Sequence, residues 1–444
     1  MSSLDVAEDI IKAAKSRDAE AEVFFCKSDS ISVTQRLLKQ EEVLQSSAEK
    51  VGIRVILNGK RSSCVSSDDF ERIGDLVDTA VAIASSSPED PYLAISDVDT
   101  KYASGGADDL ALFDNSMLSM EEIGNLLHEV ENAALSYDSK IVNSEGASFS
   151  YSNNEITLAT SRGFYGSYKR SYFSTSVSVV ASDDKMETDY SFSVKSHLVD
   201  LEDPKSLGED AAYRALRKLK SREMKTAKVP VVFENRVASS LLRNFASAIN
   251  GSSIADKSSF LAGKIGEKLF GHGINIVDDP LLVRGISSRP FDGEGVASRK
   301  NYVVQNGELK SWVLDMRTGK QLSLCTTANA IRHSNASVSP GVSNFYVEGS
   351  SISPQDLMSD IKNGLYVTDL FGFGVNLTTG DYSQGVFGFA IENGSISYPV
   401  SGVTIAGNLS DMFAEMQVAN DLVFLRSVNS PTLRFDGMIV SGSG

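Results

Sequence analysis

GLYVTDLFGFGVNLTTGDYSQGVFGFAIENGSISYPVSGVTIAGNL, residues 364–409, is the stretch in which strand and turn signals are densest. Asn393-Gly394 predicts a type I′ hairpin, because both central residues of that turn need positive φ. A polar segment at 378–382 interrupts the strand pattern and favours a functional loop. Around these turns, short strands are predicted at 366–370, 386–392, 396–399 and 403–406.

Length and composition describe a globular chain of more than one domain. Its 444 residues predict about two to three domains. Hydrophobic residues make up 41% and charged residues 23%, a balance typical of folded proteins. The net charge of −16 argues against a nucleic-acid-binding protein, because neutralising phosphates requires a basic face.

The three cysteines, Cys26, Cys64 and Cys325, are widely spaced and form no CxxC pair. They therefore indicate a reducing compartment rather than a disulfide framework. The N-terminal stretch carries acids where a signal peptide would carry bases, and no apolar run approaches the ~18 residues that span a bilayer. A cytoplasmic location is expected.

The first predicted unit, 1–90, combines two helices with strands. An amphipathic helix is predicted at 2–17, and Asp68 or Asp69 is expected to cap a second helix that runs through Ile83. Asn58-Gly59 predicts a hairpin. Between the helices, strands are predicted at 21–27, 30–38, 42–47, 51–57 and 61–66.

The pattern starts again in a second unit, 119–225, after a linker at 91–118 that contains prolines and a glycine pair. Ser119 and Glu122 have the spacing of a capping box. A closing helix is predicted at 207–222, and the recurrence indicates an internal duplication of an α+β unit. The strands of this unit are predicted at 140–145, 147–151, 155–161, 166–181 and 187–196.

The third predicted domain, 226–444, is rich in strands. It opens with an apolar strand at 229–233 and a helix that is expected to end at Asn250-Gly251. Asn306-Gly307 is a further hairpin signal. Short helices are predicted at 354–362 and 409–418. The predicted fold class is therefore α+β, with a duplicated helix and antiparallel-sheet N-terminal half followed by a β-rich C-terminal domain.

Histidine-based and nucleophilic chemistry find little support. His128 precedes Glu129, but Asn132 and Ala133 occupy the positions at which a zinc-peptidase helix needs its second ligand. A solvated helix face is the favoured interpretation. There is no GxSxG elbow, and no cysteine has the electropositive surroundings of a nucleophile. None of the four histidines is spaced as part of a ligand pair: His128, His197, His272 and His333.

Three polar clusters remain as candidate sites. Their residues fall in turns, and turn residues that satisfy their own backbone would explain each cluster without a function. The clusters are Arg289 with Asp292 and Glu294, the segment 378–382 with Thr379, Asp381 and Tyr382, and the segment 332–335.

These clusters, in this order, resemble the PmbA/TldD family, also called the modulator-of-gyrase or peptide-maturation family, and its PmbA (TldE) branch in particular. The resemblance covers essentially the whole chain and is strongest from about residue 230 onward. The matching segments are DKSSFLAGKIGEKLF (256–270), DDPLLVRGISSRPFDGEGVASR (278–299), NGELKSWVLDMRTGKQL (306–322), NLTTGDYSQGVFGFAIENG (376–394) and PVSGVTIAGNLSDMF (399–413).

The resemblance implies a soluble intracellular peptidase assembly. TldD-type subunits carry a HExxxH zinc helix and a further cysteine ligand near the C-terminus, whereas PmbA-type subunits share their fold and pair with them without that motif. The motif position falls here at Arg243, Asn244 and Ala248, which supply no zinc ligand and no general base, and the cysteine is missing as well. The resemblance therefore implies no catalytic residue and no metal in this chain, with zinc in a TldD-like partner.

The preferred hypothesis is a TldE-like subunit that completes the substrate channel of a TldD-type zinc metallopeptidase acting on unfolded or leader peptides. Extended peptide would add as a strand to the β-rich half. A non-enzymatic homodimeric peptide-binding protein, or an autonomous hydrolase with a serine or an acid pair, are the alternatives. Candidates for lining the peptide groove or subunit interface are Asp292, Glu294, Thr379, Asp381 and Tyr382.

Overall fold

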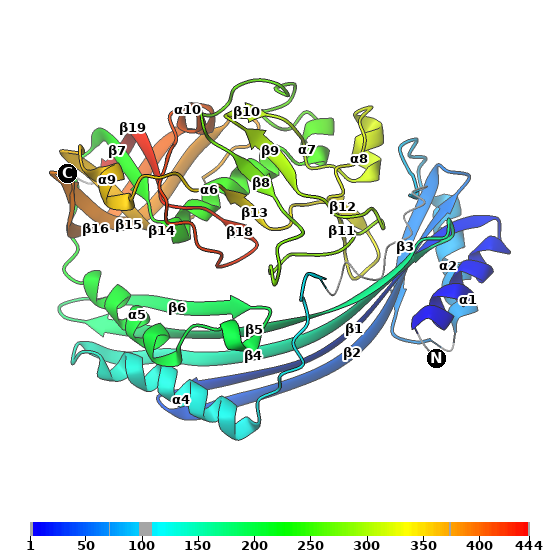
Figure 1. Ribbon diagram of the computed structural model, residues 1–444, viewed down its shortest axis with the longest axis horizontal. Coiled ribbons are helices and arrows are strands. Elements are labelled where there is room, and N and C mark those ends of the chain that lie inside the picture. The colour runs from blue at the N-terminus through cyan, green and yellow to red at the C-terminus, as the bar shows by residue number, and fades with distance from the viewer. Residues whose placement is uncertain (1–2, 71, 97–108, 373, 443–444) are drawn as a thin grey trace.

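A curved six-stranded antiparallel sheet lies beneath a C-terminal β-rich domain in the computed structural model (Figure 1), which describes residues 3–70, 72–96, 109–372 and 374–442. Residues 97–108 of the expected linker lie outside the described residues. The strand order is β3-β2-β1-β4-β5-β6. The strands are β1 (Ala19–Arg36), β2 (Lys39–Leu57), β3 (Arg61–Ser67), β4 (Ile141–Thr160), β5 (Tyr165–Ser182) and β6 (Met186–Lys195).

Two similar units build this sheet, and the pairing of β1 with β4 joins them. Each unit supplies three antiparallel strands between two helices, which confirms the duplicated α+β pattern. A short 3-10 helix, η1 (Leu198–Asp200), precedes the last of these helices. The helices are α1 (Ser3–Lys15) and α2 (Ile73–Ser86) in the first unit, and α4 (Met120–Ser136) and α5 (Pro204–Arg217) in the second.

Several predicted strands are parts of longer ones. β1 is one strand of 18 residues and β2 one of 19, where four shorter strands were predicted, because the polar run at 28–30 stays paired on both sides. The turn between them is Leu37-Leu38, with φ of 49° and 61°. Leucine is not a typical residue for this conformation, so the turn carries no sequence signal.

Helix starts give a mixed result. The capping box at Ser119 and Glu122 is confirmed. The cap expected at Asp68 or Asp69 is wrong, because α2 begins only after Arg72 and has no side-chain cap.

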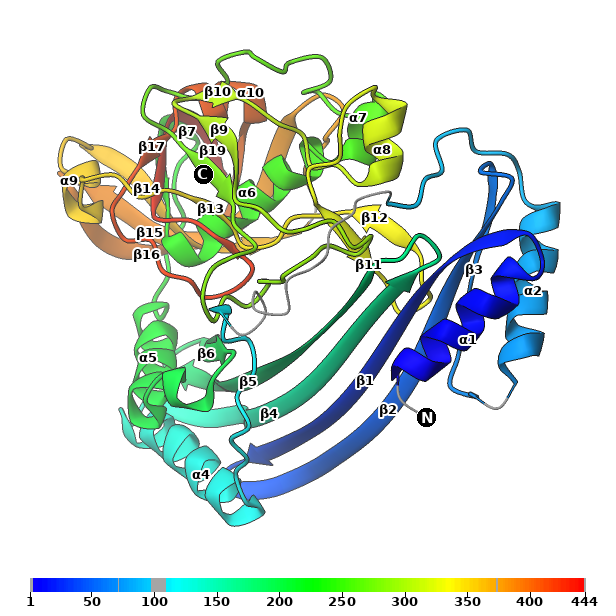
Figure 2. The same cartoon turned by 45° about the vertical axis from the view of Figure 1, so that its right-hand side comes forward.

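The two faces of the sheet have different partners (Figure 2). Odd-numbered residues of β1 pack under the helices, with Val23 in the α1–α2 cluster and Val33 in the α4–α5 cluster. Side chains alternate along a strand, so even-numbered residues such as Glu22 and Phe24 face the C-terminal domain. The concave face of the sheet is therefore the face that meets the rest of the chain.

The C-terminal domain contains a closed barrel. β7, β14, β15, β16 and β19 pair in sequence around it, and the pairing of β16 with β19 closes the ring. The predicted strands at 396–399 and 403–406 are one strand, and Asp381 and Tyr382 belong to β15 rather than to a loop. The strands of this sheet are β7 (Ala227–Phe233), β14 (Asn363–Phe371), β15 (Asp381–Glu392), β16 (Ser395–Asn408), β17 (Gln417–Val418) and β19 (Leu433–Gly442).

All three Asn-Gly turns are confirmed. Asn58-Gly59, Asn306-Gly307 and Asn393-Gly394 each have positive φ at both residues, and each joins two antiparallel strands. These turns fix strand register locally, which is why the sequence alone could locate them.

A second sheet, in the order β10-β9-β8-β13-β18, packs beside the barrel. Asn250, expected to end a helix, instead begins the next one, since its side chain accepts a hydrogen bond from the Ser252 amide. The remaining elements are β8 (Ile276–Asp278), β9 (Asn301–Gln305), β10 (Glu308–Leu309), β11 (Ala330–Arg332), β12 (Val338–Pro340), β13 (Phe345–Val347), β18 (Val428–Asn429), α6 (Asn235–Ala248), α7 (Gly251–Ala255), α8 (Met316–Gln321), α9 (Pro354–Met358) and α10 (Leu409–Ala414).

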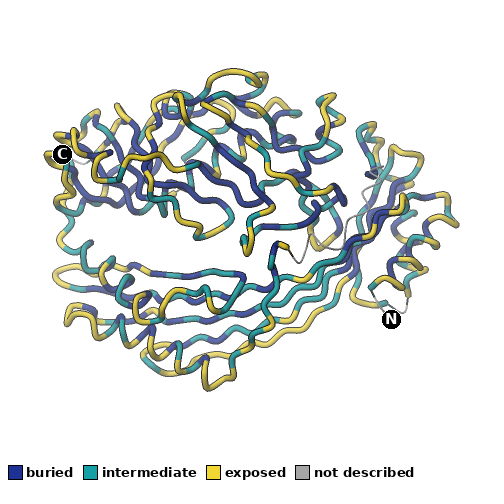
Figure 3. Tube along the Cα trace, viewed as in Figure 1, coloured by how far each residue is buried: buried dark blue, intermediate teal, exposed yellow. Residues whose placement is uncertain are grey.

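One margin of the N-terminal sheet is uncovered (Figure 3). Residues 39–49 of β2 are exposed or nearly so on both faces, and β3 pairs with β2 only from Val51 onward. No helix among the described residues has the length and apolar character needed to cross a membrane.

Candidate functional site

A cleft of about 360 Å³ opens beside α6, where the N-terminal sheet approaches the C-terminal domain. One wall is α6, another is β6 with Tyr190 and Phe192, and the others are the end of β14 and the segment 423–430. Both halves of the chain therefore build this cleft.

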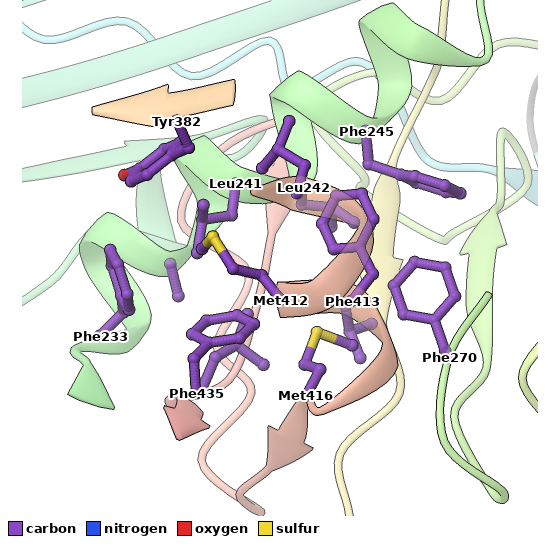
Figure 4. Packing of buried hydrophobic residues seen from close by; sticks show 14 of the residues in the cluster. Phe233, Leu241, Leu242, Phe245, Phe270, Tyr382, Met412, Phe413, Met416 and Phe435 are labelled. Atoms are coloured by element: carbon purple, nitrogen blue, oxygen red, sulfur yellow. The ribbon is translucent and has the colours of Figure 1, made fainter. Parts of the chain in front are cut away.

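The position of α6 follows from its amphipathic sequence. Its inward residues recur at helical spacing and pack into the core of the C-terminal domain (Figure 4). Phe245 lies with its ring 5.2 Å from that of Phe270 and 5.5 Å from that of Phe413. With this face buried, Ser240 and Arg243 are left to line the cleft. The buried apolar residues of α6 are Ala238, Leu241, Leu242, Phe245 and Ala248.

The start of α6 is fixed by an ion pair with the N-terminal half. Glu234 precedes the helix, makes no side-chain cap and is 8% exposed. Its carboxylate accepts hydrogen bonds from Arg214 at 3.0 Å and Arg217 at 3.2 Å, both on α5. These contacts connect the cleft wall to the second N-terminal unit.

Arg243 reaches into the cleft from the exposed face of α6. Its Nη1 donates a hydrogen bond to Ser239 Oγ at 3.2 Å. Partial burial and then the nearby positive charge of Arg426 lower the pKa of Arg243 from its ordinary value. An arginine so placed is still protonated at neutral pH, so this end of the cleft carries a fixed positive charge.

The other two arginines of the cleft lie over the rings of Tyr190 and Phe192. Arg426 lies over the Phe192 ring at 4.4 Å. Arg236 lies over the Tyr190 ring at 3.9 Å and donates a hydrogen bond to the Tyr190 carbonyl at 2.9 Å. The one acidic residue in the lining, Asp369, accepts a hydrogen bond from Lys218 at 3.0 Å.

A zinc ion does not fit the residues at the motif position. Arg243 offers no lone pair, Asn244 is half-buried, and Ala248 is fully buried in the core, away from the cleft. Within the described parts of the chain, no three His, Cys, Asp or Glu residues are grouped so that they could hold a metal ion.

A second cavity, of about 240 Å³, lies between the concave face of the sheet and the C-terminal domain. Phe24, Leu158 and Tyr168 form its sheet side, and Arg289 and Asp292 line it from the domain. Asp292 is 2% exposed. Both Asp292 oxygens accept backbone hydrogen bonds, from the amides of Glu294, Val296 and Ala330.

A buried charge cluster stands beside this cavity and joins the two halves. Glu22 of β1 forms ion pairs with Arg54 at 3.2 Å and with Arg332 at 2.7 Å. Arg54 also lies 3.5 Å from Glu294, whose other oxygen accepts the Met316 amide. Burial, reinforced by the neighbouring Asp292 and only partly offset by Arg54, raises the pKa of Glu294 to about 8.

The structure unites two of the three polar clusters predicted from the sequence. Arg332 donates a hydrogen bond to the Gly293 carbonyl at 2.8 Å, so the 332–335 segment meets the turn that carries Asp292 and Glu294. Asp292 lines the second cavity, whereas Glu294 is fully buried beside it.

The third cluster lies elsewhere. Thr379 and Asp381 are exposed, and the Thr379 hydroxyl donates a hydrogen bond to the Asp381 carboxylate at 2.6 Å. Tyr382 is 2% exposed in the core, where burial raises its pKa above the ordinary value. None of the five candidate residues lines the α6 cleft. Their groove or interface role stays a prediction.

Sequence reasoning missed Arg426 and Phe192. Arg426 is an isolated arginine in a segment without a motif, and Phe192 lies in an ordinary alternating strand. Of the cleft arginines, the sequence singled out only Arg243, because it occupies the position of the zinc motif. The partners of Arg243 come from segments far away in the chain, so only the folded structure reveals them.

Models of PmbA/TldA metallopeptidase domains match three parts of this chain: domain 1 at residues 21–84, the central domain at 113–219 and the C-terminal domain at 226–442. The metalloprotease PmbA homolog of Haemophilus influenzae is 34% identical, over 98% of this chain and 94% of its own length. Metalloprotease PmbA of Escherichia coli O157:H7 is 33% identical, over 97% and 94%.

A solved structure agrees with these relatives. The crystal structure of a Bacteroides thetaiotaomicron protein described as a modulator of DNA gyrase superposes with a TM-score of 0.90. It is 25% identical and the match covers 99% of both chains. The chain therefore belongs to the PmbA/TldD metallopeptidase family and resembles its PmbA (TldE) branch.

Proposed function

We propose that this chain is the non-catalytic, PmbA-like subunit of a zinc metallopeptidase complex that cleaves unfolded or leader peptides. The carrying observation is the end of α6, where Arg243, Asn244 and Ala248 replace every group that could bind zinc or act as its general base. A solved structure matches this chain over 99% of its length with a TM-score of 0.90, so these three residues alter the chemistry of the helix and not the fold. Zinc and catalysis then belong to a TldD-like subunit.

The uncovered margin of β2 supports a partner. An exposed strand edge presents unpaired amide and carbonyl groups, and proteins usually cover such edges. Val43 and Leu44 are apolar residues there that are 42% and 56% exposed. We place the TldD-like subunit on this margin.

The α6 cleft is the better place for peptide in this proposal. A peptide that adds as a strand needs a long open sheet edge. The barrel has none among the described residues, because the pairing of β16 with β19 closes the ring and the outlying strand β17 has two residues. The edge strands of the neighbouring sheet, β10 and β18, also have two residues each. The cleft is open, is lined by both halves and contains Arg243, the first of the three motif positions.

Purified chain, alone and mixed with a TldD-like subunit from the same organism, tests this function. Zinc would be measured by plasma mass spectrometry, assembly by native mass spectrometry, and cleavage with an unfolded protein substrate. We expect no stoichiometric zinc and no cleavage from the chain alone, and a mixed complex whose cleavage is abolished by a chelator.

Zinc-dependent cleavage by the chain alone would overturn the proposal. Activity that survives chelation would favour an autonomous hydrolase instead. A stable homodimer that binds peptide and ignores the TldD-like subunit would favour a non-enzymatic binding protein.

A further inference from the structure

The α6 cleft is positively charged in a chain that is strongly negative. The whole chain carries a net charge of −16. The lining of the cleft nevertheless contains three arginines, Arg236, Arg243 and Arg426, and one acid, Asp369. A concave site of opposite sign to the rest of the molecule attracts an anion.

Two of these arginines have no carboxylate partner in the described structure. Asp369 is engaged by Lys218 at 3.0 Å, and Arg236 lies 3.9 Å from Asp189. Arg243 has only its hydrogen bond to Ser239, and Arg426 has only the face of Phe192. Their guanidinium groups therefore keep free donors for a ligand.

The surroundings hold both groups in place. Asn429, 3% exposed, accepts hydrogen bonds from the amides of Leu425 and Arg426 and donates one to the Arg426 carbonyl at 2.6 Å. This fixes the segment that presents Arg426. On the other wall, Ser239 is 7% exposed and restrains Arg243. A preorganised pair of this kind loses little freedom on binding.

The rim distinguishes a peptide from a small inorganic anion. Phe371 and Val423 line the cleft and are 57% and 47% exposed, and Leu425 and Val428 extend the apolar lining. A hydrophobic side chain next to an anionic group would bury these surfaces, whereas phosphate would leave them in water.

We propose that the α6 cleft binds the C-terminal carboxylate of a peptide between Arg243 and Arg426, with the adjacent side chain against Phe371 and Val423. The choice of peptide as the ligand rests on the proposed function. Guanidinium and carboxylate form paired, charge-assisted hydrogen bonds, which makes this the natural anion for the two groups.

Fluorescence anisotropy with the chain alone tests the site. The probe is an N-terminally labelled peptide that ends in leucine with a free carboxylate, compared with the same peptide ending in an amide. We expect the amide to bind at least tenfold more weakly, and Arg243→Gln and Arg426→Gln each to weaken the free acid about tenfold while barely affecting the amide.

Arg72→Gln is the matched control, because its side chain is 73% exposed on the far end of the sheet. It should bind like wild type. Circular dichroism confirms that each variant is folded. Three results would overturn the site. The acid and the amide could bind with equal affinity, or both arginine variants could bind the acid as wild type does. Inorganic phosphate could also displace the labelled peptide at a lower concentration than the unlabelled acid does.

This assay contains no zinc subunit and measures no cleavage. Failure of carboxylate binding therefore leaves the proposed complex intact, and failure of the complex leaves the carboxylate site intact.

Discussion

Arg243 changes what the end of α6 can bind. A metal ion at this position would polarise a peptide carbonyl, whereas a guanidinium offers a permanent charge and directed hydrogen-bond donors. The family resemblance located this position in the sequence, and the residue types there predicted that it supplies no zinc ligand. The sequence could not predict that Arg426 would stand nearby, since that contact depends on the fold of the segment 423–430.

Glu294 should make stability fall as pH rises. Its pKa of about 8 in the folded chain exceeds the ordinary 4.5, so between these values the folded state holds a proton that the unfolded state has lost. Stability contributed by this group therefore decreases across that window, by up to about 1.4 kcal/mol per pH unit. Glu294→Gln removes the titration, and urea unfolding from pH 5.5 to 8 should show a shallower loss than wild type.

The control for Glu294 is Glu89→Gln, which removes a carboxylate that is 56% exposed. It should keep the wild-type pH slope. A slope for Glu294→Gln as steep as that of wild type would mean that another group causes the dependence.

At the scale of elements, the sequence predicted the turns and the helix cap whose geometry depends on neighbouring residues alone. The Asn-Gly turns and the Ser119 capping box were found from the sequence because their conformations are set by adjacent residues. The Leu37-Leu38 turn was not, because tertiary contacts impose it: both amides donate to the buried Glu131 carboxylate of α4, each at 2.8 Å.

Two helix glycines should respond to alanine with opposite sign. A Cβ at Gly208 of α5 would lie 2.2 Å from the Val130 carbonyl of α4, so Gly208→Ala should force the helices apart and destabilise by about 1–3 kcal/mol. A Cβ at Gly124 of α4 meets nothing within 4 Å, and Gly124→Ala should stabilise by about 0.5–1 kcal/mol. Urea midpoints measure both. A Gly208→Ala variant as stable as wild type, or more stable, would contradict close packing of α5 on α4.

At the scale of the molecule, the halves meet through buried charges as well as apolar contacts. Glu22 and Arg54 are neighbours across β1 and β2 on the concave face, and Arg332 comes from the other domain. The fold class was predictable because hydrophobic and turn patterns define it. The contact between the two halves was not predictable. A charged residue in a strand is expected to face solvent, and the sequence does not show that a second domain buries it.

Glu22→Gln should destabilise the joint strongly. It leaves Arg54 and Arg332 buried with one fewer negative charge, and loss of one member of a buried charge cluster costs about 3–5 kcal/mol. Glu20→Gln, on the same strand, breaks a pair with Arg162 whose side chains are 35% and 37% exposed, and should cost less than about 1 kcal/mol. Thermal unfolding compares the two. Equal effects would show that the cluster does not hold the halves together.

The exposed margin of β2 provides the last test of assembly. If a TldD-like subunit covers this strand, Leu44→Lys should place a charge in the interface and weaken the mixed complex about tenfold or more, because an unpaired buried charge is unfavourable. Leu44 is 56% exposed in the chain alone, so the Leu44→Lys variant should fold like wild type. Ile83→Lys, which alters an apolar side chain on α2 that is 47% exposed, is the control and should assemble normally. Native mass spectrometry of the mixtures measures the complex, and equal assembly by both variants would place the partner on a different surface.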